Sequence, residues 1–305
     1  AAAPPPRRAW RLAPGPRLAL ALLVTLGVAA LLAPLLAPAD PRTQHDLGTL
    51  VWRPPSTAFP LGTDSAARDV LSRLLHGARV TLGMALVAVL VSLGIGTVVG
   101  AVAAAARGVV DALLMRVADA MLAFPRLLLL ILVVAGYGHP GNAVLAAIIG
   151  ATGWMTTSRL VRQETRRLLA TEYVRGARAL GVPRRRVLRQ HVLPALAPTL
   201  AAAGVLAFAS SVPLESGLSF LGLGVQAPHA SWGNIIADAD SRPLAHWWLV
   251  LFPTLAIVAT VVAANVLAEG LASPISTTEG SAGSDAAGRP AAGPMGATPA
   301  AGDAA

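Results

Sequence analysis

The stretch RLVRQETRRLLATEYVRGARALGVPRRRVLRQHVLP, residues 159–194, decides the fold, because it gathers most of the charge of a very apolar chain. Ten arginines face two glutamates here, a local balance of +8 in a protein whose formal net charge is +9. Of the 305 residues, 55% are hydrophobic and only 13% are charged, which excludes a soluble protein. Charge confined to one loop indicates membrane topology and not nucleic-acid binding.

Apolar blocks of about 20 residues, the length that crosses a bilayer, lie on both sides of this stretch. Six are expected, at about 18–37, 80–106, 117–135, 143–158, 199–223 and 248–268. The first is too long for the apolar region of a secretory signal and is followed by others, so it is predicted to be a retained span. The sequence therefore predicts an all-α, polytopic membrane protein with six transmembrane helices.

The third block is interrupted by Asp119 and Arg126, and the positive-inside rule decides whether it crosses. Arginines at 7, 8, 11 and 17 assign the N-terminus to the cytoplasm, and Arg107 and Arg116 are inside again two spans later. If the third block did not cross, the ten-arginine stretch would lie outside. The block is thus expected to cross, with both termini cytoplasmic. Asp119 is three residues from Arg116, a spacing that allows an ion pair.

This topology divides the chain into five parts. They are a cytoplasmic N-terminal tail at 1–17, a first transmembrane helix at 18–39, an extracytoplasmic loop at 40–79, a core transmembrane domain at 80–271 with a cytoplasmic loop at 162–194, and a disordered cytoplasmic tail at 272–305. The last part is rich in Ala, Gly, Ser and Pro and cannot bury enough surface to order itself.

The composition also excludes several chemistries. All 24 basic residues are arginine, and a phosphate-binding P-loop requires lysine, so ATP hydrolysis must come from a partner. The absence of cysteine excludes disulfides, thiolate metal sites and a cysteine nucleophile. The six histidines show no metal-binding spacing. No metal site, no cofactor and no catalytic residue are therefore expected.

The arginine-rich stretch contains two amphipathic pieces. In the first, apolar residues recur at helical spacing, at Leu169, Tyr173, Ala177 and Leu180. Gly181 suits a helix C-terminus, and Pro183 opens the second piece. A helix, a glycine turn and a second helix are expected to project into the cytoplasm. Anionic lipid headgroups or a protein groove could receive the apolar stripe, and composition favours neither.

Residues 171–194 resemble the EAA loop of bacterial ABC importer permeases, in which EAA is followed by three residues, Gly, nine residues and I-x-L-P. Gly181, Leu193 and Pro194 fall on that spacing, whereas Arg175, Gly176 and His191 depart from it. Other segments are similar to the DppC/OppC-type subunit of peptide/nickel importers: LGTDSAARDVLSRLLHGAR at 61–79, LMRVADAMLAFPRLLL at 114–129, LESGLSFLGLGVQAPHASWGNII at 214–236 and NVLAEGL at 265–271. The resemblance covers about 18–271.

This resemblance implies a type I ABC importer permease fold in a bacterial inner membrane, and a path for di- or oligopeptides. Nickel or a metal chelate is the alternative cargo. The implied partners are a second permease subunit, two cytoplasmic ATPase subunits and an extracytoplasmic binding protein, but no nucleic acid. The implied ATPase-coupling residues are Glu172, Tyr173, Arg175, Gly176, Ala177, Arg178, Ala179, Leu180, Gly181, Leu193 and Pro194.

Glu215 and Ser219 are the candidate path residues, since a carboxylate within an apolar block is costly unless it faces a cavity or a partner. Glu215 could meet the amino terminus of a passing peptide, or it could be a structural charge paired at the outer mouth. From another class, an intramembrane enzyme would need a catalytic pair, and the sequence offers none.

Overall fold

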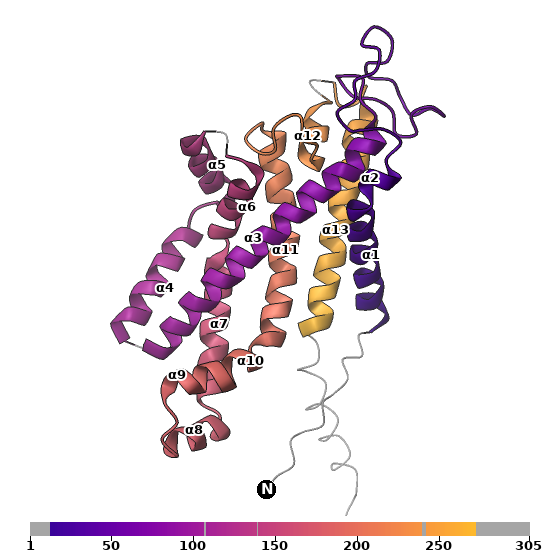
Figure 1. Cartoon of the computed structure of the whole chain (residues 1–305). Helices are drawn as coiled ribbons and strands as arrows, with labels where there is room; N and C mark the ends of the chain where they lie inside the picture. The colour runs from indigo at the N-terminus through magenta and orange to yellow at the C-terminus, as the bar shows by residue number, and fades with distance from the viewer. Residues whose placement is uncertain (1–12, 107, 139, 240–241, 273–305) are drawn as a thin grey trace, which may run out of the picture. The chain divides into compact units, whose positions relative to one another are not determined.

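The computed structural model describes residues 13–106, 108–138, 140–239 and 242–272, and helices dominate these ranges (Figure 1). The chain divides into two compact units, Ala1–Ala272 and Ser273–Ala305. The second unit lies outside the described residues, and so do residues 1–12 of the predicted N-terminal tail and nearly all of the predicted C-terminal tail. Among the described residues, β pairing is limited to one isolated bridge between Thr63 and Asp69.

The helices fall into long and short elements. The long ones are α1 (Pro14–Leu31), α3 (Val70–Ala106), α4 (Gly108–Leu122), α5 (Arg126–Tyr137), α6 (Asn142–Ala151), α7 (Trp154–Leu169), α11 (Ala197–Phe220) and α13 (Trp247–Ala272). The short ones are α2 (Ala33–Leu36), α8 (Glu172–Ala179), α9 (Arg184–Val187), the π-helical turn η1 (Leu188–Val192), α10 (Leu193–Ala195) and α12 (Trp232–Ala237).

Four of the described helices, α1, α3, α11 and α13, are each long and apolar enough to cross a membrane. Two bent pairs qualify when each is taken as one span, α4 with α5 at 90° and α6 with α7 at 46°. The predicted all-α fold with six spans agrees with this count, but the third and fourth blocks are not straight helices. The α4–α5 bend falls at Pro125, whose ring cannot continue a helical hydrogen-bond ladder.

The second span differs from the prediction in where it begins. Helix α3 begins at Val70, well before residue 80, so part of the predicted outer loop is helical. Asp69 causes the early start, because its carboxylate accepts hydrogen bonds from the backbone N–H and the hydroxyl of Ser72, at 2.8 and 2.6 Å. A carboxylate in this position satisfies the free N–H groups of a first helical turn.

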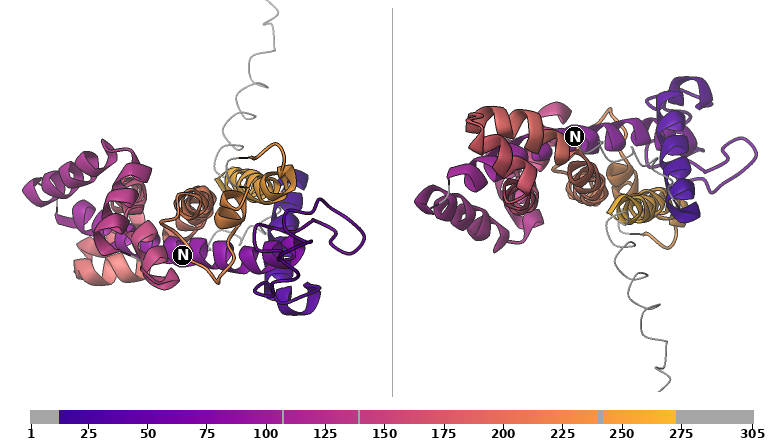
Figure 2. Two further views of the ribbon diagram at one scale, coloured as in Figure 1. Left: turned by 90° about the horizontal axis from the view of Figure 1, so that it is seen from above. Right: turned by 90° about the horizontal axis from the view of Figure 1, so that it is seen from below.

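Helix α3 runs along the bundle in both views of Figure 2, and α7 packs closely against it. A Cβ atom at Gly96 would lie 2.6 Å from the Thr157 Cβ, and one at Gly100 would lie 2.8 Å from the Val161 Cβ. Both distances are too short for a real side chain. The two glycines, four residues apart, therefore allow the helix backbones to approach closely, as small residues do in membranes.

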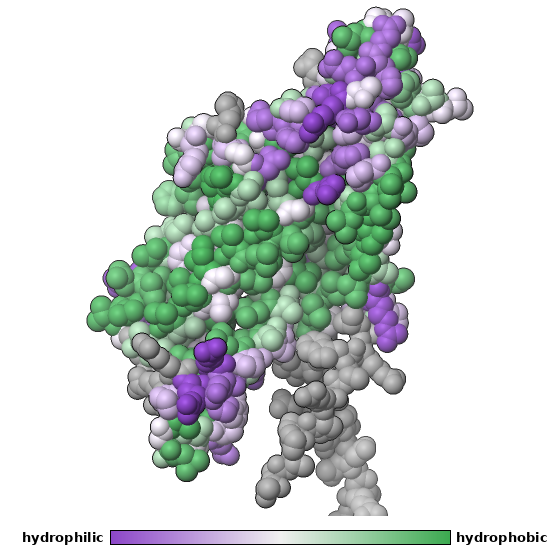
Figure 3. Space-filling view, in the orientation of Figure 1, coloured by the Kyte–Doolittle hydropathy of each residue, from purple (hydrophilic) through white to green (hydrophobic). Residues whose placement is uncertain are grey.

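The surface shows a broad hydrophobic band between two more hydrophilic ends (Figure 3). Leu90 of α3 and Leu132 of α5 are 63% and 72% exposed, as expected of side chains that contact lipid. One end is formed by residues 170–196, called here the loop unit. The opposite end is formed by residues 37–69 and 224–239, called here the cap (Figure 1).

Candidate functional site

The loop unit has the helix, glycine turn and second helix predicted from its sequence. Helix α8 ends before Gly181, whose φ of +83° is the left-handed conformation that glycine adopts without steric cost. The Val182 N–H donates to the Ala177 carbonyl oxygen at 3.2 Å, which closes the helix end in a Schellman turn. The chain reverses here, and α9 begins immediately after Pro183.

The loop unit also has an apolar core of its own, which the sequence did not reveal. Val174, Val187 and Val192 are almost completely buried. They pack with Leu168 of α7 and with Leu196, which leads into α11. The signal for this core was Val174, which lies about 100° around α8 from Tyr173 and so outside the predicted apolar stripe, because apolar residues on two faces of a short helix need two partners. The core joins the loop unit to both α7 and α11.

Most residues predicted to contact a partner lie on the outside of the loop unit. Tyr173 and Leu180 are 52% and 87% exposed, and Ala177, at helical spacing between them, is partly buried. The other exposed members are Glu172, Arg175, Gly176, Ala179, Gly181, Leu193 and Pro194, while the side chain of Arg178 is outside the described ones. Within the described chain, no atom lies within 4 Å of a Cβ built at Gly176 or Gly181. A second protein could therefore approach this backbone closely.

Several arginines of the charged stretch are paired with carboxylates on α4. Arg162 and Arg166 both pair with Asp111, and one contact, from Arg162 Nη2 to Asp111 Oδ2, is 2.7 Å. Asp119 pairs with Arg159. In the described part of the chain it forms no ion pair with Arg116, so that expectation was wrong. The spacing of three residues permitted the Arg116 pair, but α7 packs against α4 and brings Arg159 to the carboxylate.

The arginines nearer the tip of the loop unit have no such internal partners. Arg175, Arg186 and Arg189 are exposed, and no ion pair among the described residues includes them. The arginines of α7 thus pair with carboxylates within the bundle. The described arginines of the loop unit make no ion pair there and are available to an outside partner.

Glu215 and Ser219 lie inside the bundle, on α11. Glu215 is 0% exposed, and Ser219 is 2% exposed and donates a hydrogen bond of 2.7 Å to Glu215 Oε1. The carboxylate also interacts with the hydroxyls of Ser216, Thr81 and Ser231. Thr81 belongs to α3 and Ser231 to the cap, so one buried carboxylate links three segments of this chain.

The family of the protein follows from its sequence. The model of the binding-protein-dependent transport system inner membrane component matches residues 96–275, more than half of the chain. The chain belongs to this family. It is therefore the membrane component of a transport system, with several spans in the inner membrane, and the intramembrane-enzyme alternative is rejected.

Relatives of this permease include the predicted DppC/OppC type. The dipeptide transport system permease protein DppC of Bacillus subtilis is 35% identical over 271 residues, 86% of this chain and 82% of the relative. The oligopeptide transport system permease protein OppC of Mycobacterium tuberculosis is 35% identical over 254 residues, 83% and 86% of the two chains. The di/tripeptide transport system permease protein DppC of Pseudomonas aeruginosa is 37% identical over 261 residues, 83% and 84%.

The fold of the permease is also found in a solved structure. A chain of the MetNI methionine ABC transporter, in an inward-facing conformation, superimposes with a TM-score of 0.52 at 16% identity. The match covers 66% of this permease and 97% of that chain. The predicted ABC importer permease fold is confirmed.

Proposed function

We propose that this permease conducts peptides across the inner membrane, together with a second permease subunit with which it forms the path. In this proposal, two cytoplasmic ATPase subunits drive transport and an extracytoplasmic binding protein delivers the substrate. The family is named for its dependence on a binding protein, and the relatives described above are named for dipeptide, oligopeptide and di/tripeptide transport. Both support the proposal.

The observation that carries the proposal is the construction of the loop unit. Its inner face packs as a small core against α7 and α11, while Tyr173 and Leu180 stand exposed outside. An apolar face rimmed by unpaired arginines suits a groove with an apolar floor and an acidic rim. Because the core is packed, force on the outer face would move α7 and α11 with it. The loop unit is thereby suited to couple ATPase closure to the spans.

The proposal requires the loop unit and both termini to be cytoplasmic and the cap to be extracytoplasmic. The arginines of the loop unit support this orientation through the positive-inside rule. The chain has no cysteine, so single cysteines can be introduced without background labelling from it. In intact cells, a membrane-impermeant thiol reagent should label Thr49→Cys and not Arg189→Cys. The reverse labelling would refute the orientation.

The coupling role is tested by Leu180→Asp, with Leu244→Asp as a matched control. Leu180 and Leu244 are 87% and 92% exposed, so neither carboxylate disturbs a packed core of this chain. In the purified complex, Leu180→Asp should reduce ATPase retention at least about tenfold, since an unpaired carboxylate buried in an apolar groove is strongly unfavourable. Leu244→Asp, in the turn before α13, should retain the ATPase. Equal retention by both variants would refute the role.

The peptide cargo is tested by uptake into proteoliposomes that contain the whole complex and its binding protein. ATP-dependent uptake of a labelled di- or oligopeptide is the expected result. Uptake of nickel or of a metal chelate in its place would support the alternative cargo and leave the coupling role intact.

We also infer that Glu215 and Ser219 are structural and do not line the path. The hydroxyls around the Glu215 carboxylate come from this chain itself, and its side chain has no exposed surface. Glu215→Gln should then lower the yield of assembled complex and leave transport per complex unchanged. Normal assembly with impaired transport would return both residues to the path.

A further inference from the structure

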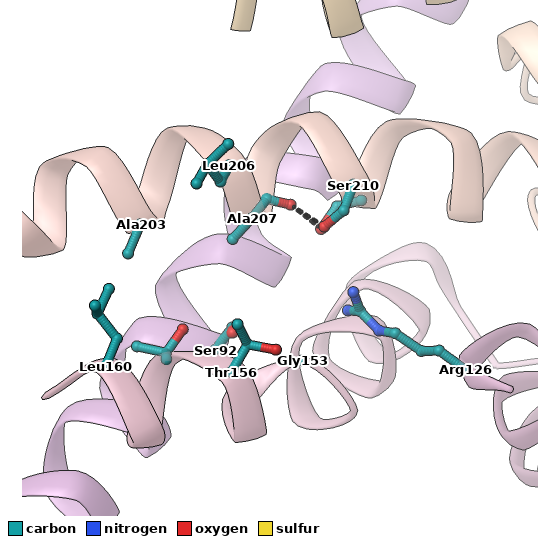
Figure 4. A pocket seen from close by; sticks show the side chains of 11 residues that line it. Ser92, Arg126, Gly153, Thr156, Leu160, Ala203, Leu206, Ala207 and Ser210 are labelled. Carbon is teal, nitrogen blue, oxygen red and sulfur yellow. Dashed lines mark hydrogen bonds between the residues drawn. The ribbon is translucent and has the colours of Figure 1, made fainter. Parts of the chain in front are cut away.

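A cavity of about 330 Å³ lies between α11 and the α3–α7 pair, beside the first residue of α5, and it is partly open, because Thr156, Leu160, Leu206 and Ser210 of its lining are exposed. Its polar lining includes Ser92, Arg126, Thr156 and Ser210, and Gly153 forms part of the wall (Figure 4). Figure 4 shows the Arg126 side chain reaching between α11 and α7 toward these hydroxyls. None of the residues that line the cavity is acidic.

Arg126 is held in this position by two features of the fold. It donates a hydrogen bond of 2.8 Å to the Ile149 carbonyl oxygen near the end of α6. A Cβ atom at Gly153 would lie 2.7 Å from Arg126 Nη2, so the missing side chain at the α6–α7 bend provides the space for the guanidinium. No ion pair among the described residues includes Arg126.

Two hydrogen-bonding groups in the cavity have no partner in the described chain. Arg126 Nε and Ser92 Oγ are both buried and neither makes a hydrogen bond. A guanidinium has five N–H donors and no acceptor, and a hydroxyl can also donate. Buried donors without partners are uncommon in folded proteins, and each calls for an explanation. The cavity therefore has an excess of positive charge and hydrogen-bond donors.

The position of the cavity along the helices bears on why it has this excess of positive charge and donors. Ser92 and Ser210 each lie about 20 Å along their helices from Ala106 and Ala197, the ends nearer the loop unit, at about 1.5 Å per residue. Both serines thus lie away from the ends of helices that are long and apolar enough to cross a membrane. An arginine at such a position is costly unless it faces water or an opposite charge.

We propose that this cavity is an anion subsite on the translocation path, at which Arg126 receives the carboxylate of a passing peptide, chiefly its C-terminal carboxylate. This inference rests on the peptide transport proposed above. Arg126 Nη2 already donates to the Ile149 carbonyl, and Arg126 Nε and Ser92 Oγ are buried, so the remaining N–H groups of the guanidinium are the ones that would donate to the carboxylate. The walls formed by α7 and α11 continue into the loop unit, so movement of that unit changes the subsite.

Two other roles for Arg126 compete with this one. As a cation near the end of α6, it could stabilise the helix through the Ile149 carbonyl alone. It could also pair with a carboxylate of the second permease subunit. Pairing with a partner carboxylate would cancel the charge that the first test below measures. The bond to the Ile149 carbonyl would leave that charge in place, so the second test, which compares a peptide with its C-terminal amide, separates this role from the subsite.

The first test uses Ser210→Cys as a single thiol beside Arg126 in the otherwise cysteine-free chain, within the full complex during turnover. A sulfonate-bearing and a trimethylammonium-bearing methanethiosulfonate are compared by their rates of reaction. We expect Arg126→Gln to lower the anionic-to-cationic rate ratio about tenfold, as loss of a nearby charge predicts. Arg159→Gln is the matched control and should keep the ratio, because Arg159 pairs with Asp119 outside the cavity lining.

An unchanged ratio in Arg126→Gln would overturn the proposal, because the charge would then already be neutralised by the partner subunit. A thiol that reacts with neither reagent would also overturn it, because the cavity would not be on an aqueous path. Arg126→Lys guards against misfolding, since it keeps the charge and should retain most of the wild-type ratio.

The second test compares uptake of a tripeptide and of its C-terminal amide, each at a concentration that saturates the binding protein. The unmodified permease should transport the free acid several-fold faster, and Arg126→Gln should remove the difference. Equal rates for both peptides in the unmodified permease would refute the subsite alone. If neither peptide is transported, the proposed function itself fails.

Discussion

The two ends of the permease differ in whether their charged side chains form ion pairs within the chain. In the cap, Asp64 accepts from Arg68 at 2.7 Å and also pairs with Arg73, which in turn pairs with Asp238. Asp64 and Arg73 are buried, and Arg68 and Asp238 are partly buried, with side-chain exposures of 14% and 24%. In the loop unit, the arginines at 175, 186 and 189 are exposed, and no ion pair of the described chain includes them.

Apolar groups show the same contrast. Two tryptophans attach the cap to neighbouring helices. Trp248 Nε1 of α13 donates to the Thr63 carbonyl of the cap at 3.1 Å, and Trp232 Nε1 of the cap donates to the Leu74 carbonyl of α3 at 3.2 Å. The loop unit leaves Leu180 almost entirely exposed. Contacts within the chain thus hold the cap in place, although Leu47 of the cap is 57% exposed. The loop unit presents Leu180 and arginines that no contact within the described chain covers. Substitutions in the cap should therefore change stability, and substitutions in the loop unit should change assembly.

The largest effect is expected from Asp64→Ala in the cap. It removes the acceptor of two arginines and of the Ala66 and Arg68 backbone N–H groups. Breaking a buried ion pair from one side costs about 3–5 kcal/mol. Thermal unfolding of the purified complex should show a large fall in the midpoint temperature.

Asp46→Ala is the control for that substitution within the same segment. Its carboxylate is fully exposed, and hydrogen bonds from Thr49 and Gly48 hold the pKa of Asp46 below its ordinary value. Asp46→Ala should leave the midpoint almost unchanged. Equal falls for the two variants would mean that the ions of the cap do not form the closed network described here.

A matched pair of glycines sharpens the comparison between the ends. Gly181 in the loop unit and Gly222, at the end of α11 next to the cap, have φ values of +83° and +74°, and neither has an atom within 4 Å of an added Cβ. Valine at either position should cost about 1–2 kcal/mol through the left-handed backbone alone. Only Gly181→Val should also lose the ATPase, as measured by subunit retention. Loss of the ATPase in both variants would show that general destabilisation is responsible.

The sequence predicted those features that depend on residues close together in the chain. Run lengths of apolar residues indicated the spans, and Gly181 followed by Pro183 indicated the turn of the loop unit, because both rest on local backbone chemistry. The bend at Pro125 was missed. Arg126 was read as an interruption of a straight span, although the bend places its side chain in a cavity.

Polar contacts between residues far apart in the chain could not be predicted from the spacing of residues in the sequence. Asp111 lies 51 residues from Arg162, and only the packing of α4 against α7 brings the two together. Glu215 was placed in an apolar block, but its partners Thr81 and Ser231 come from other segments. Hydrophobic patterns show which residues avoid water, and they do not show which buried polar groups meet.

The smallest effects are expected on α7, where arginines paired with a buried carboxylate give way to arginines in more exposed pairs. Asp111 has a side-chain exposure of 9% and pairs with two arginines, whereas Glu164 has a side-chain exposure of 18% and pairs with one, Arg167, which is 65% exposed. Asp111→Asn should lower stability by about 1–2 kcal/mol, because charged hydrogen bonds are lost in a partly buried site. Glu164→Gln should cost under about 0.5 kcal/mol, as exposed pairs do.

The effect of Glu164→Gln should also vanish in high salt, which screens exposed charges more than buried ones. If Glu164→Gln were the more destabilising of the two at every salt concentration, then burial would not be what separates the arginines used within the bundle from those left for a partner.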